Sequence, residues 1–193
     1  KSGKVSLNQN VSDYLPDFTL ELKPMRQITL AELATHTSGL PFDAPSQINS
    51  RQSLIHYLRW WKFPKDIGKT WIYSNIGMGL LGDCLSAISN EDYNNLYREK
   101  ILKPLGMQPI GIEIPDNLIS YYSQGYGNDG IPAHRVHLPA REAAGSIKAS
   151  AKDMERFLAL AIGLPGSPEF LLSAMRLTQT PFIHLQNFDQ GLG

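Results

Sequence analysis

The chain has 193 residues, and its 18 Lys and Arg balance 18 Asp and Glu, so the formal net charge is zero. This balance gives no electrostatic reason to expect nucleic acid or an anionic membrane surface as a partner, because both favour a basic face. The composition, 42% hydrophobic and 19% charged, is that of a globular chain and predicts one unit over residues 1–193. The longest apolar run, residues 157–164, is far shorter than the ~20 residues of a spanning helix, so no membrane span is expected.

Helix-capping signals punctuate the first half of the chain. Thr29 and Glu32 form a capping box that predicts a short helix ending near His36. Ser50 is expected to cap a second helix, from about Arg51 to Trp61. A third helix over 76–89 would place four apolar residues on one side, and a fourth over 91–102 would stop before a proline. The four apolar residues are Met78, Leu81, Leu85 and Ile88.

The second half is less regular until its end. Residues 104–139 are rich in Gly and Pro, with one possible short strand at 112–114 and a turn cluster at 125–130. Ser150 and Asp153 are expected to cap another helix, which Gly163 ends, and Pro168 opens the last one. The fold class is therefore predicted to be mainly α, without the strand–helix alternation of a doubly wound sheet. The helix after Ser150 is expected to turn five residues inward: Met154, Phe157, Leu158, Ala161 and Ile162.

The tripeptide Tyr73-Ser74-Asn75 follows a glycine-containing loop and precedes an apolar helix. Residues two apart in an extended turn point to the same side, so Tyr73 and Asn75 should converge while Ser74 points away or caps the helix. A phenol can move a proton, and a carboxamide can donate to a carbonyl oxygen. The alternative is structural: Tyr73 packs in the core and Asn75 is the helix cap.

Two segments that contain histidine are weaker candidates for a functional site. Ser38 follows His36 closely, but it lacks the first glycine of G-x-S-x-G, which favours a turn at the end of a helix. His134 and His137 lie in a proline-flanked loop without a His-Glu-x-x-His pattern, so neither zinc nor another cofactor is expected. Cys84 is the only cysteine, which excludes a disulfide within the chain.

Several segments in a fixed order resemble the serine β-lactamase and penicillin-binding-protein family. Tyr73-Ser74-Asn75 with its helix resembles the second active-site motif of that family, and the spacing throughout is closest to class C β-lactamases. The resemblance covers essentially the whole chain. Its other segments are Leu33-Ala34-Thr35-His36-Thr37-Ser38-Gly39-Leu40-Pro41, Leu102-Lys103-Pro104-Leu105-Gly106-Met107, Gly145-Ser146-Ile147-Lys148 and, at the two ends, Gly3-Lys4-Val5-Ser6-Leu7-Asn8 and Gln190-Gly191-Leu192-Gly193.

The resemblance also implies parts that this chain lacks. In the family the nucleophile lies in Ser-x-x-Lys, and no serine here is followed three residues later by lysine. A Lys-Thr-Gly strand is expected beyond Gly193. The chain is therefore expected to be a central fragment, the helical lobe of an α+β fold with most of the antiparallel sheet absent, and to be inactive alone.

For the complete protein, the resemblance implies that the missing serine forms an acyl-enzyme that water hydrolyses, with no cofactor. Tyr73 is expected to be the general base or proton relay. Asn75 is expected to hydrogen-bond the substrate amide and a lysine beside the nucleophile. Because a free phenol has a pKa of about 10, the two motif lysines, both outside this chain, would have to stabilise the phenolate.

The same resemblance places Asp43, Ser74, Gly145 and Ser146 on the substrate-binding side. Where class C enzymes commonly carry Gln, this chain has Asp43, which accepts hydrogen bonds but cannot donate them and would oppose an anionic substrate. At Gly145 an aromatic residue is expected, and its absence removes one wall of the cleft. Both departures favour peptidase or esterase activity over cephalosporin hydrolysis.

Three functions stay open on the sequence. They are a class C-like serine β-lactamase, a D-alanyl-D-alanine peptidase or esterase of the same family, and a non-catalytic binding or scaffold module. Either enzyme would act on a small molecule, a β-lactam or a cell-wall peptide, and the resemblance implies the periplasm. An apolar surface left uncovered by the missing sheet predicts self-association of the chain.

Overall fold

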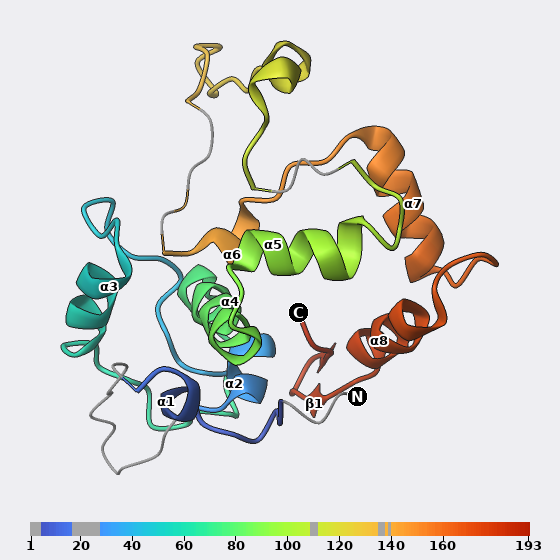
Figure 1. Ribbon diagram of the computed structural model, residues 1–193. Helices are drawn as coiled ribbons and strands as arrows, with labels where there is room; N and C mark the ends of the chain where they lie inside the picture. The colour runs from blue at the N-terminus through green and yellow to red at the C-terminus, as the bar shows by residue number, and fades with distance from the viewer. Residues whose placement is uncertain (1–4, 17–27, 109–111, 135–137, 139) are drawn as a thin grey trace.

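The computed structural model describes residues 5–16, 28–108, 112–134, 138 and 140–193. Of the residues singled out above, Gly3, Lys4 and His137 lie outside this part of the chain. Figure 1 shows the helices arranged around α4 (Asn75–Ser89), which runs through the middle of the molecule. Within the described residues the fold is mainly α, as predicted.

The hydrophobic core lies among four helices near the start of the chain. α1 (Val11–Tyr14) and α2 (Leu30–Ala34) pack against α4, and α3 (Arg51–Leu58) closes the outer side (Figure 1). Burying each Leu or Ile side chain contributes about 1.5–3 kcal/mol to stability, so this cluster holds the four helices together. Its buried members are Val11, Leu15, Ile28, Leu30, Leu33, Leu40, Leu54, Ile55, Leu58, Ile67, Ile76, Leu80 and Cys84.

The predicted caps of α2 and α3 are confirmed. The Glu32 N–H donates to Thr29 Oγ1 (3.3 Å), while the Glu32 carboxylate accepts from the Thr29 N–H (2.9 Å). Ser50 caps α3, but this helix ends at Leu58 and not near Trp61. The chain tightens there into i to i+3 hydrogen bonds, and Trp61 turns its indole N–H to the Gly39 carbonyl (3.0 Å).

The predicted third helix is α4, but its most buried face differs from the prediction. Ile76, Leu80 and Cys84 are fully buried, whereas Met78, Leu81, Leu85 and Ile88 are only half-buried. The reason is that α4 has neighbours on several sides: α1, α2, α5 (Tyr93–Tyr97) and α6 (Glu142–Gly145). A helix with several neighbours has no single inward stripe that its own sequence defines.

The segment after α4 partly follows the prediction. The expected helix over 91–102 is α5, capped by Asp92, and then a π-helical turn, η1 (Arg98–Leu102). The strand expected at 112–114 is wrong. The backbone of Ile112 is hydrogen-bonded to side chains and not to a neighbouring strand. Its N–H donates to Asn94 Oδ1 (3.2 Å), and its carbonyl accepts from Lys148 Nζ (2.8 Å). A 3₁₀ helix, η2 (Asp116–Tyr121), and the predicted turn at 125–130 follow.

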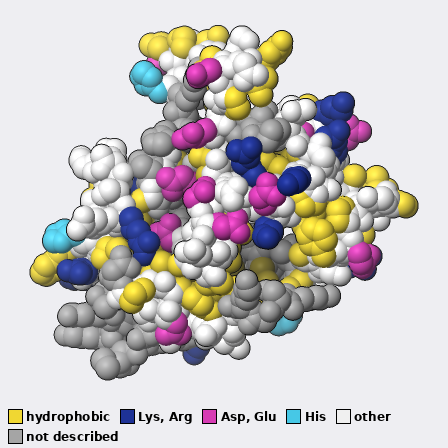
Figure 2. All heavy atoms as spheres, in the orientation of Figure 1, with side chains coloured by type: hydrophobic (Ala, Val, Ile, Leu, Met, Phe, Trp, Pro, Cys, Tyr) yellow, Lys and Arg dark blue, Asp and Glu magenta, His cyan; other side chains and the backbone are white. Residues whose placement is uncertain are grey.

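The last two helices, α7 (Ala151–Ala161) and α8 (Glu169–Gln179), pack against each other. The capping box of Ser150 and Asp153 is confirmed, and Gly163 ends α7 in a left-handed conformation. The predicted inward face is wrong for three of its five residues: Met154, Leu158 and Ile162 are 50%, 58% and 64% exposed, whereas Phe157 and Ala161 are half-buried. In the described part of the chain α8 contacts α7 from another side, and apolar side chains gather over this region at the right of Figure 2.

The sheet of the described region is one short antiparallel ladder. β1 (Ile183–His184) pairs with β2 (Asp189–Gln190), with Ile183 opposite Gln190. After β2 the chain returns to α2, where the Gly193 N–H donates to the Ala34 carbonyl (2.8 Å). Among the described residues, every helix is too short or too polar to cross a membrane.

Candidate active site

Ser74 fixes the Tyr73-Ser74-Asn75 turn to the protein interior. Its fully buried hydroxyl donates to the Pro41 carbonyl (2.7 Å) and accepts from the Gly77 N–H (2.9 Å), so Ser74 is the N-cap of α4. The alternative in which Asn75 caps the helix is therefore wrong. Ser74 is extended, with φ −142° and ψ 111°, so its neighbours project from the opposite side.

Tyr73 lies at the surface and not in the core, since 40% of it is exposed. Its ring is part of an aromatic cluster with Phe42 (centroids 5.8 Å apart), Trp71 (6.2 Å) and His36 (4.6 Å). Phe188, near β2, meets the ring of Trp71 edge-on at 5.7 Å. These contacts surround the phenol with apolar walls while leaving it accessible.

Asn75 and Asp43, both predicted as site residues, lie together. The Asn75 carboxamide N–H donates to Asp43 Oδ2 (3.2 Å), and the Asn75 backbone N–H donates to the Phe42 carbonyl (2.8 Å). Asp43 Oδ1 also accepts from the Ala44 N–H (2.8 Å). The first turn of α4 and the segment at Phe42–Asp43 therefore form one unit.

Arg141 is a site residue that sequence reasoning missed. Its guanidinium lies 3.0 Å from Asp43 Oδ1, and the two side chains are 8% and 30% exposed. Gly79 makes this possible, because a Cβ there would lie 2.9 Å from the Ala140 carbonyl oxygen and the Arg141 Cα. Arg141 offsets the charge of Asp43, which weakens the repulsion of anionic substrates expected from the sequence.

The other two predicted binding residues lie at the end of α6. Gly145 is exposed, and a Cβ there would make an ordinary 3.7 Å contact with Leu138, so the position could accept a side chain. Ser146 is buried, and its N–H donates to the Glu142 carbonyl (3.1 Å). Ser146 and Ser74 therefore shape the site from within and do not face solvent.

His36 and Ser38 form the turn that connects α2 to the site. Ser38 is fully buried, and its Oγ accepts from the Leu40 N–H (3.4 Å), which confirms the predicted turn. His36 does more than expected: its Nδ1 accepts from the Ser74 N–H (3.2 Å). Burial lowers the pKa of His36, so its imidazole is neutral at pH 7. In the sequence, His36 is marked only by its place in His36-Thr37-Ser38-Gly39. That pattern predicts a turn but not the contact with Ser74.

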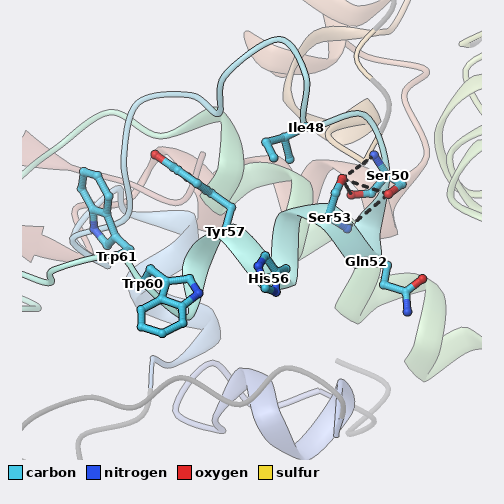
Figure 3. Close-up of a pocket in the computed structure, with 8 residues that line it drawn as sticks. All are labelled: Ile48, Ser50, Gln52, Ser53, His56, Tyr57, Trp60 and Trp61. Atoms are coloured by element: carbon cyan, nitrogen blue, oxygen red, sulfur yellow. Dashed lines mark hydrogen bonds between the residues drawn. The ribbon is translucent and has the colours of Figure 1, made fainter.

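Away from this turn, the surface has other hollows. One, of about 700 Å³, lies along α3 (Figure 3), and Trp60, 79% exposed, stands at its edge. None of the predicted site residues lines it. Its lining residues are Ile48, Ser50, Gln52, Ser53, His56, Tyr57, Trp60 and Trp61. In the part of the chain that the structure describes, no group of three or more His, Cys, Asp or Glu side chains could hold a metal ion.

A sequence model of the β-lactamase family matches residues 1–193. A β-lactamase of Providencia stuartii is 34% identical over 157 residues, which is 81% of this chain and 40% of that protein. A solved class C β-lactamase superimposes with a TM-score of 0.88 at 28% identity, over 99% of this chain and 53% of its own.

Two further structures are similar over the same region. One is a class C β-lactamase in complex with cefoxitin, with a TM-score of 0.86 at 28% identity over 98% of this chain and 53% of its own. The other is a β-lactamase/D-alanine carboxypeptidase from Pseudomonas syringae, with a TM-score of 0.85 at 25% identity over 98% and 52%. The chain spans about half the length of the relatives it matches. The match of the family along all 193 residues shows that the chain belongs to the β-lactamase family.

Proposed function

We propose that this chain supplies the Tyr-Ser-Asn part of the active site of a class C-type serine β-lactamase, and that a longer protein supplies the rest. The observation that carries the proposal is the turn at the start of α4, where Ser74 is locked inward while Tyr73 remains partly exposed. The half-length overlap with the relatives supports a longer protein. Because its substrates would be β-lactams or cell-wall peptides, we place it in the periplasm.

In the proposed reaction, the serine of the longer protein attacks the lactam carbonyl carbon. The serine proton passes to Tyr73 and on to the lactam nitrogen as the C–N bond breaks, and water then hydrolyses the ester. Asn75 would donate to the carbonyl of the substrate amide with the second hydrogen of its NH₂ group, because the first is given to Asp43. Phe42 would provide an apolar wall beside Tyr73.

The test begins with the reading frame that flanks the chain. If it encodes Ser-x-x-Lys and Lys-Thr-Gly, the longer protein should hydrolyse nitrocefin, and Tyr73→Phe should lower turnover by about 10²-fold or more with an unchanged melting temperature. Residues 1–193 alone should hydrolyse none. Turnover by those residues, abolished by Tyr73→Phe, would overturn the need for the other motifs. A frame without Ser-x-x-Lys would favour a non-catalytic binding module.

A D-alanyl-D-alanine peptidase or esterase is the second candidate. Asp43 favours it, since a carboxylate paired with Arg141 offers no donor to a cephalosporin side-chain amide, and so does the missing wall at Gly145. The likeness to a protein described as both β-lactamase and D-alanine carboxypeptidase also supports it. Mass spectrometry after penicillin treatment separates the two: a penicilloyl adduct on the longer protein that persists for hours favours the peptidase, and rapid release favours the β-lactamase.

A further inference from the structure

We propose that His36 is a positioning residue that holds the phenol of Tyr73 in its working orientation; this rests on the proposed role of Tyr73 in proton transfer. His36 contacts three consecutive residues, Ile72, Tyr73 and Ser74, through three different groups. Among the described residues of the site, His36 alone contacts this turn through its backbone, a side-chain nitrogen and a ring face.

The backbone of His36 supplies the first contact. His36 has a left-handed conformation, with φ 56°, directly after α2 and its C-cap Thr35. This conformation directs its carbonyl to the Ile72 N–H at 2.8 Å. His, Asn and Asp adopt positive φ more readily than other residues with a side chain, so the turn restricts which residues can occupy the position.

The imidazole nitrogen supplies the second contact. Because Nδ1 accepts from the Ser74 N–H at 3.2 Å, it carries no hydrogen, and the neutral ring has its hydrogen on Nε2. The imidazole is buried, which excludes competing water from this hydrogen bond. The amide next to Tyr73 is therefore fixed from inside the protein.

The ring face supplies the third contact. The imidazole lies 4.6 Å from the Tyr73 ring with 31° between the planes, and Trp71 meets its edge at 5.8 Å and 77°. A phenol supported on one face by a fixed ring has fewer accessible rotamers. Since proton transfer depends on placing the two oxygen atoms within hydrogen-bond reach, loss of this support should lower turnover.

Two variants separate these contacts. His36→Asn keeps a side-chain acceptor and tolerates positive φ but removes the ring, whereas His36→Phe keeps a ring but leaves the Ser74 N–H without its acceptor. His56→Asn, at an exposed histidine of α3, is the matched control. The protein is labelled with ¹³C-tyrosine, and the signal of Tyr73 is assigned from its loss in Tyr73→Phe.

We expect His36→Asn to retain the native melting temperature within a few degrees and to shift the Tyr73 ring signal, while His56→Asn leaves that signal in place. In the longer protein, His36→Asn should lower kcat about 10- to 100-fold with little change in KM. In a Tyr73→Phe background it should cause no further loss, because both changes act on the same proton transfer.

An unmoved Tyr73 signal in His36→Asn would overturn the positioning role, whatever the protein catalyses. An equal fall in kcat with and without the Tyr73 hydroxyl would also overturn it, by showing that His36 acts elsewhere. If His36→Asn does not fold, the same two readings are made on His36→Gly, which also tolerates the positive φ and removes the ring. If Tyr73→Phe itself leaves turnover intact, the proposed function fails while the ring signal still decides the role of His36.

Discussion

Asp43 and Arg141 form an ion pair whose partners are buried unequally, with 30% of the Asp43 side chain exposed and 8% of Arg141. Either residue can be removed by substitution, but the consequences differ. A carboxylate left alone can regain water, whereas a guanidinium left alone is almost enclosed by protein. Loss of Asp43 should therefore destabilise the protein more than loss of Arg141. Asn75 donates its side-chain hydrogen bond to Asp43, the more exposed partner of the pair.

We expect Asp43→Asn to lower the free energy of unfolding by about 3 kcal/mol, because it leaves the Arg141 charge buried without a counter-charge. Arg141→Met keeps the apolar stem and leaves Asp43 partly solvated, so it should cost only about 1 kcal/mol. Urea unfolding at neutral pH measures both values. The reverse order would show that the guanidinium has another source of compensation.

His36 gives the stability of the protein a predictable dependence on pH. Burial lowers its pKa in the folded state, while the unfolded chain titrates near 6.5. Between the two pKa values the unfolded chain binds more protons, so stability falls as pH drops below about 6.5 and towards the folded pKa.

We expect the wild type to lose more unfolding free energy than His36→Asn between about pH 7.5 and pH 5.5. Acidic groups common to both proteins contribute equally and cancel in the comparison. Among the described residues, the groups placed against the imidazole are the rings of Tyr73 and Trp71 and the Ser74 N–H. Parallel pH profiles for the two proteins would contradict the buried neutral state.

At the scale of elements, the contact between α4 and α6 organises the site. Gly79 and Gly82 lie one turn apart on α4, and a Cβ on Gly82 would meet the Ala143 Cβ at 2.5 Å. The short helix α6 can therefore lie directly against the backbone of α4. This close approach brings Arg141 to the same end of α4 as Asn75.

Gly79→Ala should destabilise the protein by about 1–2 kcal/mol, because overpacking against backbone atoms outweighs the gain in helix propensity. Gly145→Ala is the matched control within α6, and its ordinary contact with Leu138 predicts no loss. Thermal unfolding of the two variants measures the difference. Equal melting temperatures would mean that α6 can shift away from α4 without cost.

At the scale of elements, the sequence predicts features that depend only on residues close together in the chain. The capping box of Thr29 and Glu32 depends on residues three apart, and the structure has it as predicted. The buried side of α7 depends on where α8 lies, and Leu158 was therefore assigned to the wrong face. At the site, the motif located Tyr73 and Asn75, whereas Arg141 reaches Asp43 from a distant part of the chain through a contact that no local pattern describes.

At the scale of the whole molecule, the exposed face of α7 is an apolar surface that favours self-association. Met154, Leu158 and Ile162 recur every four residues and form one apolar stripe, defined here as the α7 stripe. Leu164 lies exposed just beyond it, and apolar side chains are visible over this side in Figure 2. Contiguous exposed apolar surface of this kind favours association.

We predict that residues 1–193 self-associate through the α7 stripe, so Leu158→Gln should shift sedimentation towards the monomer at a fixed high concentration. Trp60→Gln is the control, because it removes an exposed apolar side chain just beyond α3 that lies outside the α7 stripe. A wild-type chain that sediments as a monomer at high concentration would rule out association. An equal effect of Trp60→Gln would assign it to general hydrophobicity.

Trp71 joins β2 to the site: its indole N–H donates to Gln190 Oε1 (3.0 Å), and its ring contacts Phe188, His36 and Tyr73. The fluorescence of Trp71 should therefore report on changes at the site. The other two tryptophans, Trp60 and Trp61, follow the end of α3. Phenylalanine at both positions keeps an aromatic ring, although at Trp61 it removes the hydrogen bond to the Gly39 carbonyl. The remaining fluorescence would then come from Trp71 alone, and a change in its emission would register any ligand that moves the neighbouring phenol.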